Sequence, residues 1–200
     1  MKGYAAFAEE DFARGYENGR RHGTSLMFHL TIEMPDMDRF VADPDRTAIA
    51  SGWVGCQELG GRLQVERGTF NLFVEGERPG EKRMLYRLHF ADGVGHPLTL
   101  SGYKVIHDDP GIDLWPDTST LYTKVLRGHV EPEEEEEAEL VASGILRIRK
   151  LDFVRQLTTF RGSGPTRLAG LRGLARFTML FAGELRKIYL SPRKFKRRRG

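Results

Sequence analysis

Residues 82–91 read KRMLYRLHFA, and this stretch decides the fold class. Met84, Tyr86, Leu88 and Phe90 face one way along it, and Arg87 and His89 face the other. A period of two places alternate residues on opposite faces of a strand. The stretch therefore predicts a β-strand with one buried face.

Six further stretches have strand character, at 24–34, 47–57, 62–75, 97–107, 119–130 and 140–150. Turn sequences such as Leu59-Gly60-Gly61 and Ala91-Asp92-Gly93 connect neighbouring stretches without a crossover helix. Seven successive strands favour an antiparallel meander, and closure into a barrel removes the long edges that an open sheet would expose. A β-sandwich is the alternative.

Helical periodicity brackets these strands. Apolar residues at spacings of three and four predict an N-terminal helix over 4–21, and the pattern returns after Lys150. We therefore predict a mainly β protein, an antiparallel, calycin-like β-barrel of seven to nine strands with one N-terminal and two C-terminal helices. The predicted segments are 1–23 (helix), 24–150 (barrel), 151–190 (two helices) and 191–200 (basic tail).

The composition excludes several protein classes. The chain has 200 residues, 40% of them hydrophobic, which suits one domain with a real core. It lacks an apolar run of about 20 residues for a membrane span, and the single Cys56 excludes a disulfide framework or a Cys-rich zinc site. Its first residues lack the pattern of a secretory signal, so we expect a cytoplasmic protein.

Positive charge gathers toward the C-terminus. Residues 161–200 hold twelve Lys and Arg and one acid, Glu184, whereas the rest of the chain is net negative. An amphipathic helix followed by a polybasic segment is typical of peripheral binding to anionic membranes. Nucleic acid is less favoured, because no recognisable nucleic-acid fold accompanies the segment, and a merely solvated tail is a third interpretation. The cations predicted to bind are Arg193, Lys194, Lys196, Arg197, Arg198 and Arg199.

The run from Glu131 to Glu139 lies between two predicted strands. Like charges repel, so we expect a solvated, mobile hairpin loop there, with chelation or protein docking as the alternative.

A polar loop follows the strand at 97–107. If the chain is an enzyme, we expect its acid–base set to be His107, Asp109, Tyr103 and Lys104, because a rigid strand positions this segment. The same Asp, Pro and Gly residues also suit tight turns for backbone reasons alone. The spacing of the loop's aspartates does not match a calcium-binding EF-hand, so we predict no metal and no cofactor.

A barrel of about eight strands is either filled by its own side chains or holds one small apolar ligand. Both interpretations stay open at this point. The aromatic residues predicted to contact such a ligand are Phe70, Phe73, Tyr86, Tyr103, Trp115 and Tyr122. Trp115 is also a candidate to plug one end of the barrel.

Several short segments form a specific set, namely 68–74 (GTFNLFV), 84–88 (MLYRL), 102–106 (GYKVI), 109–118 (DPGIDLWPDT), 152–157 (DFVRQL) and 159–161 (TFR). Together they resemble an accessory β-rich region of bacterial proteins in the cholesterol-oxidase-like branch of the glucose-methanol-choline oxidoreductases, some of which also carry an α/β-hydrolase. The resemblance covers about residues 15–190. The chain lacks the GxGxxG flavin-binding unit and the GxSxG hydrolase elbow, so neither chemistry is implied.

The resemblance implies a lipid or sterol context. The resulting hypothesis is a non-catalytic lipid- or sterol-binding accessory module that acts with a separate oxidoreductase or hydrolase. A small isomerase or cyclase acting on an apolar substrate in the barrel is the alternative. An interaction protein with an acidic loop and a basic tail is a weaker one.

Overall fold

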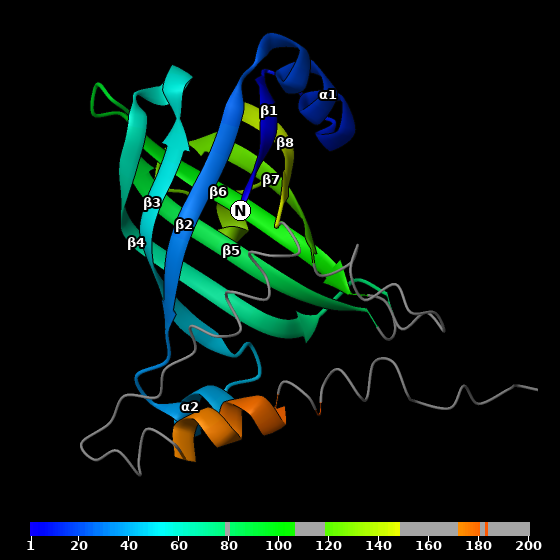
Figure 1. The fold of residues 1–200 in the computed structure, drawn as a ribbon, viewed down its shortest axis with the longest axis vertical. Helices are drawn as coiled ribbons and strands as arrows, with labels where there is room; N and C mark the ends of the chain where they lie inside the picture. The colour runs from blue at the N-terminus through cyan, green and yellow to red at the C-terminus, as the bar shows by residue number, and fades with distance from the viewer. Residues whose placement is uncertain (79–80, 107–118, 149–171, 181–182, 184–200) are drawn as a thin grey trace, which may run out of the picture.

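The computed structural model describes residues 1–78, 81–106, 119–148, 172–180 and 183. Within them, eight antiparallel strands follow chain order around a closed barrel, and β8 pairs back onto β1 (Figure 1). The predicted antiparallel barrel of seven to nine strands is therefore confirmed, with eight. Closure gives each of these strands two hydrogen-bonded neighbours.

The strands of the barrel are β1 (Lys2–Phe7), β2 (Ser25–Glu33), β3 (Thr47–Cys56), β4 (Gly61–Glu75), β5 (Lys82–Ala91), β6 (Pro97–Ile106), β7 (Thr120–Arg127) and β8 (Leu140–Arg147). The helices are α1 (Phe12–His22) and α2 (Met37–Ala42), with 3-10 turns η1 (Gln57–Leu59) and η2 (Pro132–Glu134). Residues 172–180 are also helical, inside the region predicted to form C-terminal helices. Strands β2 to β8 closely match the seven predicted stretches.

The prediction for the N-terminus is wrong. Residues 4–21 do not form one helix, because strand β1 precedes the shorter helix α1, and the barrel therefore begins at Lys2 rather than at residue 24. The inward residues of β1 are small, Gly3 and Ala5, so the strand shows no alternation of large apolar side chains. Gly23 ends α1 in the left-handed conformation, with φ 78°.

Helix α1 lies directly on the outside of the β1–β8 seam. Gly15 and Gly19, four residues apart, form its buried face. A Cβ at Gly15 would lie 2.3 Å from the Ser143 carbonyl oxygen, and one at Gly19 would lie 2.2 Å from the Ala5 carbonyl oxygen. Any larger residue at either position would therefore push the helix off the strands.

Helix α2 lies at the opposite end of the barrel and buries Phe40. The helical residues 172–180 lie beside it (Figure 1). Phe177 packs against the apolar cluster that contains Phe40, and Arg176 forms an ion pair with Asp38. These two helical segments together cover one end of the barrel.

The core consists of two apolar clusters. The α1-end cluster includes Leu26, Phe28, Val54, Phe90, Leu98 and Leu100. The α2-end cluster consists of Phe40, Ala48, Leu72, Phe73, Met84 and Ile106. Burial of these side chains is the main source of stability.

Candidate functional site

Between the two clusters lies a layer of less completely buried residues, Leu30, Ile32, Phe70 and Tyr86, which we call the middle layer. Ile32, Phe70 and Tyr86 pack against both clusters, yet each keeps part of its surface accessible. The Tyr86 ring centroid lies 4.9 Å from that of Phe70 and 5.7 Å from that of Phe28. Side chains in a close-packed interior are covered on all sides, whereas Ile32, Phe70 and Tyr86 keep some solvent-accessible surface.

The remaining strands contribute small residues at the same level. In the register, Tyr86 pairs with Gly102, and Gly102 pairs with Thr123. Thr123 also pairs with Gly144 of β8, and Gly144 in turn pairs with Ala5 of β1. Large side chains on one wall thus face small ones on the other, and the Leu121 side chain lies over Gly102, 3.3 Å from where a Cβ would be.

Lys104 extends into this interior from β6. It is 6% exposed, and its Nζ lies 5.6 Å from the centroid of the Tyr86 ring. It is the one buried lysine or arginine in the described part of the chain. Burial lowers the pKa of Lys104 to about 8 and raises the pKa of the Tyr86 phenol, because desolvation disfavours either charged form. Burial therefore favours the uncharged form of both groups.

Thr123 is the polar residue of this interior that sequence reasoning missed. It is fully buried between the inward-facing Leu121 and Val125, and its Oγ1 has no hydrogen-bond partner within the described residues. A buried hydroxyl without a partner costs about 1–3 kcal/mol. The available clue was a threonine at an inward position of a strand whose neighbouring inward residues are apolar.

Tyr103 and Tyr122, both predicted to contact a ligand, lie on the outer face of the barrel. Their rings stack at 5.4 Å, and Phe12 of α1 packs against both. They therefore do not line the interior, and α1 covers them instead. Tyr103 and Lys104 are consecutive residues of one strand, so their side chains point to opposite faces. The candidate acid–base set is accordingly divided between the outside and the inside.

The other predicted ligand contacts have different positions. Phe70 and Tyr86 face the interior. Phe73 is 1% exposed and fills the α2-end cluster, which it reaches through an irregular register and a positive φ of 55°. Its backbone conformation is unusual for a bulky residue and turns both Leu72 and Phe73 toward the core.

Several predicted site residues lie outside the described residues, namely His107, Asp109 and Trp115 in the polar loop and Arg193, Lys194, Lys196, Arg197, Arg198 and Arg199 in the tail. The same holds for 149–171 and for most of 181–190, where the remainder of the two C-terminal helices was predicted.

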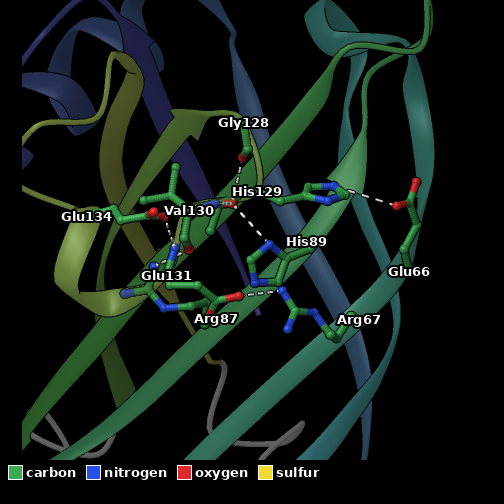
Figure 2. Close-up of polar contacts among 10 residues, drawn as sticks. Glu66, Arg67, Arg87, His89, Gly128, His129, Val130, Glu131 and Glu134 are labelled. Atoms are coloured by element: carbon green, nitrogen blue, oxygen red, sulfur yellow. Dashed lines mark hydrogen bonds and ion pairs between the residues drawn. The ribbon is translucent and has the colours of Figure 1, made fainter.

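The predicted hairpin loop, the run from Glu131 to Glu139, joins β7 to β8, and six of its nine residues are exposed. The segment 128–139 that contains it is nevertheless anchored to the barrel. It folds back over the outer face of the barrel, where Val130 is 6% exposed (Figure 2). Glu131 pairs with Arg67, and Glu135 pairs with Arg87. These arginines supply the opposite charge that offsets repulsion among the glutamates, and we call this segment the docked acidic loop.

A second polar cluster lies under the docked acidic loop (Figure 2). His89 is 3% exposed, and its Nδ1 lies 3.3 Å from the hydroxyl of Thr99. Its ring packs edge-on against His129, whose Nε2 is 3.6 Å from a carboxylate oxygen of Glu66. Burial lowers the pKa of His89, and the positive charge of Arg67 lowers it further. The imidazole is therefore neutral at pH 7 and serves to hold the loop.

Cys56 is a buried strand residue. Burial raises the pKa of its thiol to about 11, so it is not a thiolate nucleophile at neutral pH. No group of three or more His, Cys, Asp or Glu side chains among the described residues could hold a metal ion. No helix in the same part of the chain is long and apolar enough to span a membrane.

Comparisons with protein-family models, with curated proteins and with solved structures find no match to this chain.

Proposed function

We propose that the chain is a non-catalytic lipid- or sterol-binding module whose calycin-like barrel holds one apolar small molecule in the middle layer. The observation that carries this proposal is the accessible surface of Phe70 and Tyr86, two inward-facing aromatic residues of a closed barrel. An eight-stranded barrel has an interior wide enough for one small ligand. The small residues opposite Tyr86 provide further support.

The divided acid–base set supports binding over catalysis. An isomerase or cyclase in the barrel needs an acid and a base within reach of the same substrate. Tyr103 contacts Phe12 and Tyr122 on the outside, whereas Lys104 is inside. Tyr103 and Lys104 therefore cannot act together on a substrate held inside the barrel, which favours binding.

The partners belong to the same proposal. The resemblance supports a separate oxidoreductase or hydrolase that delivers or receives the ligand. The basic tail supports attachment to an anionic membrane surface, where polybasic segments are attracted electrostatically. Such a module would carry a poorly soluble molecule between a membrane and an enzyme.

Titration with the neutral apolar dye N-phenyl-1-naphthylamine tests the binding proposal. Leu30→Trp adds bulk to the middle layer, and Leu85→Trp makes the same change at an outward position of β5. We expect the wild type to bind the dye, Leu30→Trp to bind it about tenfold more weakly, and Leu85→Trp to match the wild type.

Absence of dye binding by the wild type, or equal binding by both variants, would contradict the proposal. Native mass spectrometry of the protein purified from its own host then identifies the bound molecule. Circular dichroism of each variant verifies that the barrel is folded.

A further inference from the structure

We propose that the docked acidic loop is a proton-sensitive cover, which opens from the barrel when His89 takes up a proton. The cover lies on the outer face of the barrel, so it is independent of what the interior binds. Opening exposes Arg67 and Arg87, the two arginines that pair with glutamates of the loop in the closed state.

His89 lies beneath the loop and shares a hydrogen-bonding hydroxyl with it (Figure 2). The imidazole is 3% exposed, and the ring of His129 from the loop packs edge-on against it at 5.1 Å. Thr99 on the next strand donates to the Gly128 carbonyl and accepts from the Val130 N–H. A hydroxyl has one proton, so Thr99 Oγ1 must accept from Nδ1 of His89, 3.3 Å away. The imidazole is therefore part of the anchor of the loop.

The charges around His89 oppose a proton on it while the loop is closed. They lie on three elements, namely Arg67 on β4, Arg87 on β5, and His129 and Glu131 on the loop. Burial and the three basic groups disfavour a positive imidazole, whereas Glu131 favours it. The net result is that the pKa of His89 falls below the ordinary value of 6.5, with burial as the largest cause.

Opening of the loop removes this cost. Water then reaches the imidazole, His129 and Glu131 leave with the loop, and the charges of the two arginines are screened. The pKa of His89 therefore rises toward 6.5 in the open state, so uptake of a proton below that pH favours opening. Well above pH 6.5, His89 is neutral in both states and does not bias the loop.

The charge of the outer face changes with the position of the loop. In the closed state Glu131 pairs with Arg67, and Glu135 accepts from both Arg87 and the Ser101 hydroxyl. Opening breaks both pairs, because the glutamates are on the loop and the arginines are on the barrel. The face under the loop therefore changes from charge-paired to cationic as the pH falls.

Amide hydrogen exchange of Val130, followed by NMR spectroscopy, measures the opening, because this N–H donates to Thr99 at 2.8 Å in the closed state. Rates at about pH 7.5 and about pH 5.5 are expressed as protection relative to an unfolded chain at the same pH, which removes the intrinsic pH dependence of exchange. Low urea concentrations separate the two routes of exchange, because global unfolding exposes far more surface than opening of the loop.

The test variant is His89→Asn, which keeps a donor toward Thr99 and cannot gain a charge. The matched control is His22→Gln, which removes an exposed histidine. We expect wild-type Val130 to exchange by a urea-insensitive opening, with protection that falls severalfold, and at most about tenfold, from pH 7.5 to pH 5.5. The His22→Gln control should show the same fall, and His89→Asn should change by less than about twofold.

An equal fall in the wild type and in His89→Asn would overturn the role of His89. Exchange of Val130 with the same strong urea dependence as the core amides would overturn the separate opening of the loop. Circular dichroism verifies that each variant is folded. If His89→Asn does not fold, the wild type alone decides, because pH-independent protection of its Val130 amide would also overturn the proposal.

Discussion

Thr99 and Thr123 lie on neighbouring strands and are both fully buried, but their hydroxyls have opposite surroundings. Thr99, on the outer face, donates to the Gly128 carbonyl at 2.7 Å and accepts from the Val130 N–H at 2.8 Å. It also lies 3.3 Å from Nδ1 of His89. Thr123, inside the barrel, has no partner among the described residues. The comparison distinguishes a buried hydroxyl that holds a loop in place from one that contributes no hydrogen bond to the fold.

The largest effect is expected from Thr99→Val. The substitution removes the bonds that hold Gly128 and Val130 and leaves buried backbone groups unpaired, so we expect a loss of about 2–4 kcal/mol in the free energy of unfolding. Urea denaturation followed by circular dichroism measures it. A loss below about 1 kcal/mol would show that the docked acidic loop does not depend on this hydroxyl.

The arginines under the same loop provide the next comparison. Arg87 is 14% exposed, donates to the Val130 carbonyl at 2.8 Å and pairs with Glu135, so Arg87→Met should cost about 1–3 kcal/mol. Arg67 pairs with Glu131 in a more exposed position, where Arg67→Met should cost about 0–1 kcal/mol. Urea denaturation measures both variants. An equal loss of unfolding free energy in the two variants would show that burial does not determine how much each ion pair contributes.

Thr123→Val should have the opposite sign to Thr99→Val. It replaces an unpartnered buried hydroxyl with a methyl group of the same shape, and we expect the ligand-free protein to gain about 1 kcal/mol. Destabilisation comparable to that of Thr99→Val would mean that the hydroxyl has a structural role.

The smallest effect is a pH dependence from His89. Its pKa in the folded protein is lowered from the ordinary value of 6.5, because of burial and then the charge of Arg67. His129 and Arg87 lower it further, and Glu131 opposes them. The unfolded chain therefore binds a proton first, and the free energy of unfolding should fall as the pH decreases through 6.5 toward the lower folded value.

Urea denaturation at about pH 7.5 and about pH 5.5 measures this dependence. His89→Asn, which can still donate to Thr99, should reduce it, and a His22→Gln control at an exposed position should not. An unchanged slope in His89→Asn would assign the pH dependence to other groups. Glu131, whose pKa is lowered chiefly by its hydrogen bond with Arg67, acts below 4.5 and does not overlap this range.

Sequence patterns found seven of the eight strands. Strands with clear alternation, such as β2 and β5, have large apolar residues on their inward faces, whereas β3 buries mainly Ala48, Ala50 and Val54. These patterns missed β1, whose inward Gly3 and Ala5 bury little side-chain area. Alternation also identified the shared face of Phe70 and Tyr86. The same rule separates Tyr103 from Lys104, so the proposed acid–base set conflicted with the strand prediction itself.

Other parts of the site depend on residues that are distant in the sequence. The period of β7 places Thr123 inside, but whether its hydroxyl finds a partner depends on what β6 and β8 supply, namely Gly102 and Gly144. The docked acidic loop likewise depends on Arg67 and Arg87, which are far from it along the chain. A run of like charges considered alone predicts repulsion, and only the fold reveals the opposite charges.

The seam between β1 and β8 has a consequence for synthesis. Lys2 pairs with Arg147, so the first strand of the barrel cannot complete its pairing until the last strand of the barrel has been synthesised. Hairpins from β2 to β7 need only local contacts, whereas the final ring closure joins distant parts of the chain and is the slower step. Until then β1 and β7 each lack one neighbour and expose unpaired backbone groups. Misassembly during translation should therefore occur mainly at these two strand edges. Helix α1 directly follows β1 in the chain and packs against it, so it is placed to shield the β1 edge.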